Sequence, residues 1–128
     1  MKVFFVRHEQ TNYNILDLCN DNLVKDVHLT DLGKQQAETI ANKIKNIKLD
    51  LVIISELPRT KETALIITKN HQVKFEIEPR INDRKTGFDS KPVSEFLKAV
   101  EPDIFNSKFN NGESFQEEKK EFILFWMN

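Results

Sequence analysis

Residues 3–14 are the stretch around which the chain is organised, and they read Val3-Phe4-Phe5-Val6-Arg7-His8-Glu9-Gln10-Thr11-Asn12-Tyr13-Asn14. Their apolar start predicts a β-strand over residues 2–7 that is buried on both faces and is followed by a polar turn. Arg7 and His8 stand where this strand ends, and such a pair is suited to present a nucleophile to an anion. On these residues alone, an ordinary N-terminal strand with a chance Arg-His pair explains the pattern equally well.

The composition predicts one globular domain that covers residues 1–128. Charged residues make up 30% and hydrophobic residues 39% of the chain, which is ordinary for such a domain. The net charge of −1 offers no global attraction to nucleic acid or to an anionic membrane, so any anion site must be local. No apolar run approaches the roughly 20 residues of a membrane span, and the run at residues 3–6 is too short for a signal peptide.

The cysteine content indicates the compartment. The chain has a single cysteine, Cys19, which excludes an intrachain disulfide and is typical of a reducing environment, so we expect a cytoplasmic location. Because Cys19 has no activating partner nearby in the sequence, we expect a buried or half-buried thiol. No His, Cys and Asp residues stand together at the spacing of metal ligands, so we expect no metal and no other cofactor.

The first half of the chain predicts a strand, a helix and a second strand. Residues 9–28 are rich in turn-forming residues and predict a long loop with a helical turn near residues 13–18. Thr30 is a good N-cap for the helix that follows. Residues 49–54 predict a second buried strand, so this order indicates a βαβ unit with parallel strands. The apolar stripe of the helix is expected to comprise Ala37, Ile40, Ala41, Ile44 and Ile47.

The second half of the chain continues the alternation of helix and strand. Its expected elements are a helix from Pro58 to about residue 70, a third strand over residues 73–77, a loop over residues 82–92, a short helix over residues 93–100 and a last helix that begins at a capping box formed by Ser114 and Glu117. The last helix is expected to have an apolar face made of Phe115, Phe122, Phe125 and Trp126.

Polar residues that suit an anion site follow the three predicted strands. His8, Arg59 and Asp83 each come shortly after one of them. In a parallel α/β sheet the loops after the strands gather at one edge, where ligands bind. Arg59 also stands at a helix N-terminus, which offers free N–H groups and a partial positive charge to an anion. By spacing alone, a surface charge for Arg59 and a loop cap for Asp83 remain the simpler interpretations.

Five segments, taken together, resemble the histidine phosphatase superfamily, which is also called phosphoglycerate-mutase-like. The segments are Arg7-His8-Glu9-Gln10-Thr11-Asn12-Tyr13-Asn14, Leu29-Thr30-Asp31-Leu32-Gly33-Lys34-Gln35-Gln36-Ala37, Ser55 to Ala64 with Leu57, Arg59 and Thr63, Asn82-Asp83-Arg84 with Gly87, and Gly112-Glu113-Ser114. They are similar, in this order, to the family's Arg-His-Gly signature, its Leu-Thr-x-x-Gly-x-x-Gln-Ala helix start, its Ser-x-Leu-x-Arg-x-x-x-Thr-Ala pattern, its Asn-Glu-Arg loop and its Gly-Glu-Ser turn. Each motif is weak alone, but five in sequence are specific.

The resemblance implies a fold and a set of site residues. The fold is α/β, with three α/β/α layers around a mostly parallel central sheet. His8 matches the histidine that attacks phosphorus and becomes phosphohistidine, and Arg7 and Arg59 match the cations that hold the phosphoryl oxygens. Thr11 and Asn14 match positions that line the phosphate pocket and bind substrate. Asp83 matches the family's general acid or base, which is usually a glutamate. The other histidines, His28 and His71, are expected to be surface residues without a catalytic role.

The chain departs from the family pattern in three ways. Glu9 replaces the glycine of the signature and brings a negative charge beside an anion site, and Asp83 is one methylene shorter than the usual glutamate. The family also carries a second catalytic histidine on a later strand, which lies between the first and second strands of its sheet. No residue of this chain matches that histidine, so we expect a domain that is incomplete at the C-terminus. Strands 2–7 and 49–54 must then pair directly, accept a strand from elsewhere, or leave backbone polar groups unpaired.

Three functions follow from the resemblance. The first is a phosphomonoester hydrolase that acts through a phosphohistidine on His8 and that the lack of the second histidine would impair. The second is a non-catalytic descendant that binds a phosphate ester or a partner protein. The third and weakest is a fragment of a phosphoglycerate mutase, which the short interval between Gly87 and Gly112 disfavours. The expected ligand is a small phosphorylated metabolite, and homo-oligomers or strand exchange between copies remain open.

Overall fold

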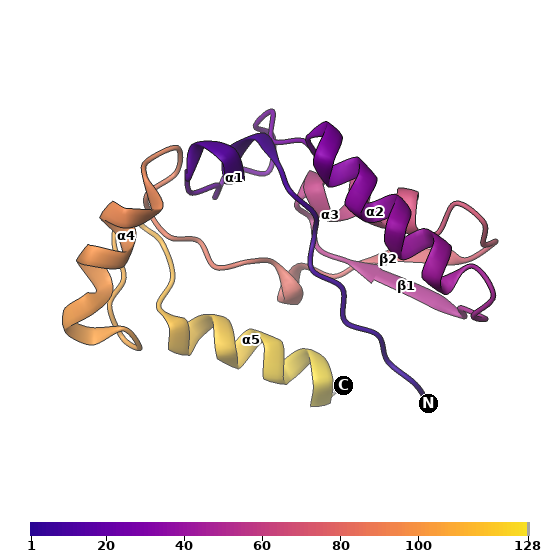
Figure 1. Ribbon diagram of the computed structural model, residues 1–128. Coiled ribbons are helices and arrows are strands. Elements are labelled where there is room, and N and C mark those ends of the chain that lie inside the picture. The colour runs from indigo at the N-terminus through magenta and orange to yellow at the C-terminus, as the bar shows by residue number, and fades with distance from the viewer. Residues whose placement is uncertain (128) are drawn as a thin grey trace.

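The computed structural model describes residues 1–127 and shows an α/β fold, as expected from the sequence (Figure 1). Its elements are α1 (Asn12–Leu16), α2 (Asp31–Ile44), β1 (Leu51–Ile54), α3 (Pro58–Ile67), β2 (Lys74–Ile77), the 3-10 turn η1 (Pro79–Ile81), α4 (Val93–Val100), the 3-10 turn η2 (Glu101–Asp103) and α5 (Phe115–Met127). Helices α2 and α3 lie on one side of the sheet layer and α5 lies on the other (Figure 1).

The sheet consists of two parallel strands in the described part of the chain. β1 pairs with β2 in a register that places Leu51 opposite Lys74 and Ile54 opposite Ile77. Helix α3 connects the two strands and packs on β1. The βαβ unit predicted from residues 2–7 and 49–54 is therefore not formed. The parallel βαβ unit that is observed joins the second and third predicted strands through α3.

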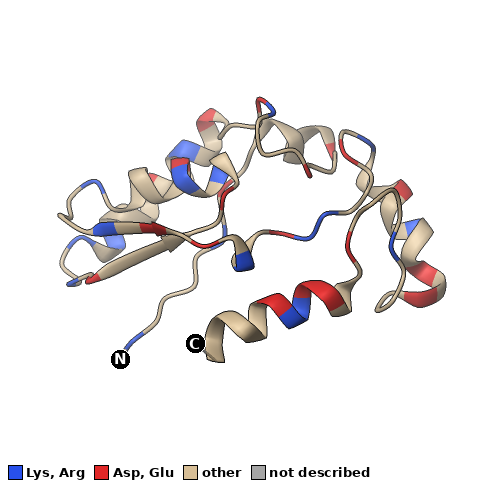
Figure 2. Ribbon diagram, turned by 180° about the vertical axis from the view of Figure 1, so that it is seen from behind, with Lys and Arg blue, Asp and Glu red and all other residues tan. Residues whose placement is uncertain are grey.

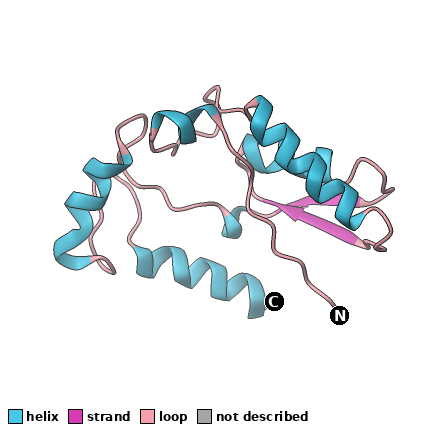
Figure 3. Cartoon of the chain, in the orientation of Figure 1, coloured by secondary structure: helices cyan, strands magenta, loops and turns pink. Residues whose placement is uncertain are grey.

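The strand predicted over residues 2–7 is wrong. Residues 1–10 belong to no helix or strand and run as an extended segment at the side of the sheet (Figure 3). Val3, Phe4, Phe5 and Val6 are 46–74% exposed, and Phe5 contacts Trp126 of α5 with ring centroids 5.6 Å apart. A strand needs a neighbour that pairs with its backbone, and no described segment forms a ladder with residues 2–7. Direct pairing of residues 2–7 with residues 49–54 is therefore not observed in the described chain.

Helix α2 forms as the sequence predicts, because it has a good cap and a stripe of small residues. The hydroxyl of Thr30 accepts the backbone N–H of Gly33 at 3.0 Å, which satisfies one of the free donors of the first turn. Ala37 and Ala41 are completely buried, and α2 packs against α3 along this stripe. Small side chains allow the two helices to approach closely, so α2 and α3 form the main packed layer of the molecule.

Helix α5 begins at the capping box that the sequence predicts. Ser114 and Glu117 each accept the other's backbone N–H, at 3.2 and 2.9 Å. Charged residues of α5 lie in its first half, and the second half is apolar and partly exposed (Figure 2). Arg80 of η1 stacks on Phe125, with 5.5 Å from its guanidinium carbon to the ring centroid. Within residues 1–127, no helix has both the length and the apolar character that a membrane crossing requires.

The start of α2 touches the backbone of the segment that carries His8. The backbone N–H of Thr30 donates to the carbonyl oxygen of Gln10 at 2.9 Å. A Cβ atom added to Gly33 would lie only 2.1 Å from the same carbonyl oxygen. The absence of a side chain at Gly33 therefore allows the helix and the segment to make contact, and this contact fixes the end of residues 1–10.

We expect Gly33→Ala to destabilise the protein, because its methyl group collides with backbone and cannot rotate away. Overpacking of this kind costs about 1–3 kcal/mol, against about 1 kcal/mol that alanine gains from its helix propensity. Thermal unfolding should show a melting temperature that is lower by on the order of 5 °C. The control is Gln35→Ala, an exposed position of the same helix, which should leave the melting temperature unchanged or slightly higher. A Gly33→Ala variant as stable as the parent would contradict the contact.

Candidate active site

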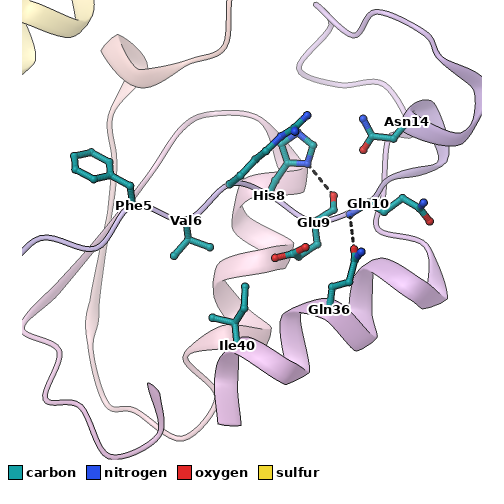
Figure 4. Close-up of a pocket in the computed structure, with 9 residues that line it drawn as sticks. Phe5, Val6, His8, Glu9, Gln10, Asn14, Gln36 and Ile40 are labelled. Carbon is teal, nitrogen blue, oxygen red and sulfur yellow. Dashed lines mark hydrogen bonds between the residues drawn. The ribbon is translucent and has the colours of Figure 1, made fainter. Parts of the chain in front are cut away.

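His8 lies at the end of the extended segment, between two cavities. One cavity of about 530 Å³ lies toward α2 and is lined by His8 together with residues such as Asn14 and Ile40 (Figure 4). The other, of about 520 Å³, lies toward α3 and α5 and brings His8 together with Arg59 and Asp83. His8, Arg59 and Asp83, which the sequence placed after three successive predicted strands, are thus gathered in one place.

The imidazole of His8 is oriented by the backbone that follows it. Its Nδ1 lies 2.8 Å from the carbonyl oxygen of Glu9 (Figure 4). Because a carbonyl oxygen only accepts hydrogen bonds, Nδ1 carries the proton and Nε2 has a free lone pair. Burial lowers the pKa of His8 from its ordinary value. The hydrogen bond to the Glu9 carbonyl raises this pKa, the charges of Arg59 and Arg7 lower it, and the net shift is downward. His8 is therefore a neutral imidazole with Nε2 available at neutral pH.

Arg59 is a buried cation at the N-terminus of α3. Its side chain is only 7% exposed, and its two terminal nitrogens donate to Asn20 at 2.7 Å and to Asp83 at 3.1 Å. Its Nε–H is also buried and has no partner among residues 1–127. Leu57, the N-cap of α3, provides no side-chain hydrogen bond to the helix start. The guanidinium and the helix N-terminus together provide a site that favours an oxyanion.

Both oxygens of Asp83 are engaged. Oδ2 pairs with Arg59, and Oδ1 accepts the backbone N–H of Arg84 at 3.0 Å. The Asp83 side chain is 64% exposed, and its charge raises the pKa of His8 in opposition to the two arginines. Asp83 therefore lies at the predicted place, but as a carboxylate that holds Arg59.

The remaining predicted site residues differ in their placement. Arg7 is exposed and lines both cavities, whereas Asn14 lines the cavity on the α2 side. Thr11 is 1% exposed and lies outside both linings. Its hydroxyl caps α1 and donates to Oδ1 of Asn14 at 3.0 Å, so Thr11 orients Asn14 and does not face a cavity itself.

Glu9 does not direct its charge at His8. Along the extended segment successive side chains alternate in direction, and the Glu9 carboxylate extends toward Ile40 of α2 while His8 lies on the other side (Figure 4). Its backbone N–H donates to the hydroxyl of Thr63 at 3.2 Å, which ties the segment to α3. The negative charge that replaces the signature glycine is therefore turned away from the imidazole.

The other two histidines lie outside both cavities. His28 is exposed and pairs with Asp26 at 3.1 Å. His71 is not the surface residue that the sequence predicts, because it is partly buried and its Nε2 lies 2.9 Å from the carbonyl oxygen of Ile47. Cys19 is 4% exposed, as expected, and burial raises its pKa. In residues 1–127, no group of three or more His, Cys, Asp or Glu side chains is arranged to hold a metal ion.

Two residues near the site were missed in the sequence. Asn20 holds Arg59, and it stands in a loop whose pattern gives no sign of this contact. Glu118 lines the cavity together with His8 and Arg59. A signal for Glu118 is present, because it follows Phe115 by three residues and precedes Phe122 by four, and both phenylalanines belong to the predicted apolar face of α5.

The match to known proteins decides the family. Residues 3–123 match the Histidine phosphatase superfamily (branch 1). The chain belongs to the histidine phosphatase superfamily. This match includes the segments of His8, Arg59 and Asp83 that the structure brings together, and it confirms the resemblance found in the five sequence motifs.

Relatives in this superfamily include phosphatases and mutases. Fructose-2,6-bisphosphatase TIGAR of Xenopus laevis is 34% identical over 95 residues, which cover 70% of this chain and 34% of that protein. A probable phosphoglycerate mutase GpmB of Erwinia tasmaniensis is 29% identical over 91% of this chain and 57% of its own length. The crystal structure of the alpha-ribazole phosphatase from Shigella flexneri superposes with a TM-score of 0.86 at 25% identity, and the match covers 95% of this chain and 63% of that one. The chain thus spans between a third and two thirds of the length of these relatives.

Replacing Arg59 should change the titration of His8. In Arg59→Gln the pKa of His8 should rise, because the buried positive charge that disfavours the imidazolium is removed while Asp83 remains. Nuclear magnetic resonance titration of the His8 ring measures this directly, and unchanged His28 and His71 signals report an intact fold. Lys61→Gln, an exposed position of α3, serves as the control and should leave the His8 pKa unchanged. A His8 pKa that stays constant or falls in Arg59→Gln would contradict the described electrostatics.

Proposed function

We propose that this histidine phosphatase domain hydrolyses phosphomonoesters of small metabolites through a phosphohistidine on His8. One observation carries the proposal: the neutral His8 ring, with Nδ1–H donated to the carbonyl oxygen of Glu9, lines the same cavity as the buried Arg59. A lone pair held beside a fixed cation is the arrangement that phosphoryl transfer needs, since catalysis of this reaction consists mainly of positioning and charge stabilisation.

The reaction has two steps. In the first, Nε2 of His8 forms a bond to phosphorus as the ester P–O bond breaks, and the alcohol leaves. In the second, water attacks the phosphohistidine, the N–P bond breaks, and inorganic phosphate is released. Arg59 and Arg7 neutralise the phosphoryl oxygens, and Asn14 contributes an amide N–H because its Oδ1 is already held by Thr11. A carboxyl group of the cavity transfers the proton, and Asp83 is the residue that the family pattern assigns.

A second candidate is a domain that binds a phosphate ester without hydrolysing it. It is favoured by one observation, which is that neither His28 nor His71 lines a cavity at His8. The site would then consist of Arg7, Arg59 and the N-terminus of α3, and it would bind an anion by charge alone. A mutase remains the weakest candidate, although one of the relatives is a probable phosphoglycerate mutase.

Steady-state hydrolysis of 4-nitrophenyl phosphate separates these functions. We expect the protein to hydrolyse this ester and His8→Asn to lower kcat by roughly 10³-fold or more, because the nucleophile is lost while the shape of the side chain is nearly kept. His28→Asn is the matched control and should retain the parent activity, since His28 is exposed and outside both cavities.

Each other outcome of the hydrolysis and binding experiments contradicts a different proposal. Binding of inorganic phosphate by calorimetry, together with no turnover of the ester, would favour the binding domain over the hydrolase. Turnover that is unchanged in His8→Asn would contradict the assigned nucleophile. Absence of both turnover and phosphate binding would contradict both proposals.

A further inference from the structure

Asn20 holds one end of the Arg59 guanidinium without facing a cavity itself. Its Oδ1 accepts a hydrogen bond from one terminal nitrogen of Arg59 at 2.7 Å, and the other terminal nitrogen donates to Asp83 at 3.1 Å. Asn20 is half-buried and lies outside the linings of both cavities at His8. An effect of Asn20 on a bound phosphoryl group must therefore pass through Arg59.

We propose that Asn20 is a positioning residue, which fixes the plane of the Arg59 guanidinium for an oxyanion and leaves the positive charge of Arg59 intact. This role rests on the function proposed above, because it concerns how the same site holds a phosphoryl group. It places a residue one contact behind those that would touch the phosphoryl group.

Two partners on separate nitrogens are needed to fix a guanidinium. The group is planar and carries five N–H donors in a rigid fork, so its orientation decides which donors reach a phosphate. A guanidinium held at one nitrogen can still turn about that contact. With Asn20 at one terminal nitrogen and Asp83 at the other, the plane is fixed, and each of these nitrogens retains a second N–H.

The Asn20 amide is itself held in the orientation that this role needs. Its Nδ2 donates to the carbonyl oxygen of Asn22 at 3.2 Å, which leaves Oδ1 directed at Arg59. The opposite orientation would place N–H groups of the amide against N–H groups of the guanidinium, and two donors cannot form a hydrogen bond with each other. The contacts at both ends of the amide therefore require the same orientation.

The backbone beside Asn20 is anchored to the loop that carries Asp83. The carboxylate of Asp21 accepts the backbone N–H groups of Thr86 and Gly87 at 2.8 and 2.7 Å, and it accepts the hydroxyl of Thr86 at 3.0 Å. These bonds join the residue after Asn20 to the turn that follows Asp83. The two partners of the guanidinium thus belong to loops that are fixed to each other.

The neutral charge of Asn20 matters as much as its position. Asp83 already forms a salt bridge with Arg59, whose side chain is only 7% exposed. A carboxylate at position 20 would place a second negative charge on the same guanidinium and would oppose the approach of an anion. An amide oxygen accepts the same hydrogen bond without that charge, so Arg59 stays available to attract an oxyanion.

Calorimetric binding of inorganic phosphate in a double-mutant cycle tests the proposal. We expect Asn20→Leu, which has a similar shape but no acceptor, to weaken phosphate binding by about 10-fold. In an Arg59→Lys background the charge remains but no planar fork can be oriented, so the same substitution should weaken binding by about twofold or less. Asn42→Leu, at an exposed position of α2, is the matched control and should leave phosphate binding unchanged.

An equal loss of affinity in both backgrounds would overturn the proposal, because Asn20 would then act on phosphate directly or through its loop and not through Arg59. Unchanged affinity in Asn20→Leu would also overturn it. If Asn20→Leu does not fold, Asn20→Ser takes its place in the cycle, since serine is readily accommodated in a loop and is too short to keep the contact.

The motion of the guanidinium provides a readout that a purely structural role would not change. Rotation about the bond between Nε and Cζ of Arg59 should be slow in the parent, because both terminal nitrogens are held, and faster in Asn20→Leu. Nitrogen-15 exchange spectroscopy measures this rotation. Asn20→Asp should keep the rotation slow, since the acceptor remains, but should weaken phosphate binding through its added charge. Equally slow rotation in Asn20→Leu, or parent affinity in Asn20→Asp, would overturn the proposal.

The positioning role and the proposed function can fail separately. Phosphate binding and guanidinium rotation are measured without turnover, so they test Asn20 whether or not His8 is phosphorylated. A protein that forms phosphohistidine on His8 but shows no coupling between Asn20 and Arg59 would overturn the positioning role alone. Coupling without phosphohistidine would support the positioning role and overturn the hydrolase, and a protein that binds no phosphate would overturn both.

Discussion

The buried guanidinium of Arg59 is the interaction on which the rest of the site depends. A charge taken out of water costs several kcal/mol unless it is paired and hydrogen-bonded. Asn20 and Asp83 supply these partners from loops that lie 39 and 24 residues away in the sequence. The two loops must therefore approach the start of α3, and the loop of Asp83 forms one wall of the cavity at His8. The Nε–H of Arg59, which has no partner in the described part of the chain, remains as a donor that an oxyanion could satisfy.

The position of His8 depends on a second constraint, which is the contact of residues 9 and 10 with α2 and α3. Residues 1–7 are exposed and form no ladder with any segment of residues 1–127, so strand pairing does not fix the position of His8. Instead Gln10 contacts the start of α2 at Thr30 and Gly33, and the backbone of Glu9 donates to Thr63 of α3. The packed pair of α2 and α3 thus holds both His8 and Arg59. His8 and Arg59 can therefore line one cavity although the sheet has only two strands in the described chain.

Much of the fold could be predicted from local patterns. The cap at Thr30, the stripe around Ala37 and the capping box at Ser114 each depend on residues that are near one another in the sequence, and each is observed. The prediction for residues 2–7 failed for a physical reason. An apolar run indicates a segment that prefers to be a buried strand, but a strand also needs a partner backbone, and no property of the run itself reports whether one is present.

Sequence motifs predicted some residues of the site. Residues that reach the site only through tertiary contacts could not be predicted. His8, Arg59 and Asp83 were expected together because loops after parallel strands share an edge. Three features could not be predicted from the sequence. Both carboxylate oxygens of Asp83 accept hydrogen bonds, and the hydroxyl of Thr11 donates to Asn14. Glu118 of α5 lines the cavity that contains Asp83. These facts depend on side-chain direction and burial, which local sequence patterns do not report.

Trapping the covalent intermediate tests the central claim most directly. The protein would be mixed with a phosphomonoester for a short time, quenched in alkali to preserve phosphohistidine, digested and analysed by mass spectrometry. The account predicts one phosphoryl group on the peptide that contains His8, absent from His8→Asn and from samples without substrate. Substrate turnover with no phosphate on His8, or phosphate on His28 or His71 instead, would contradict it.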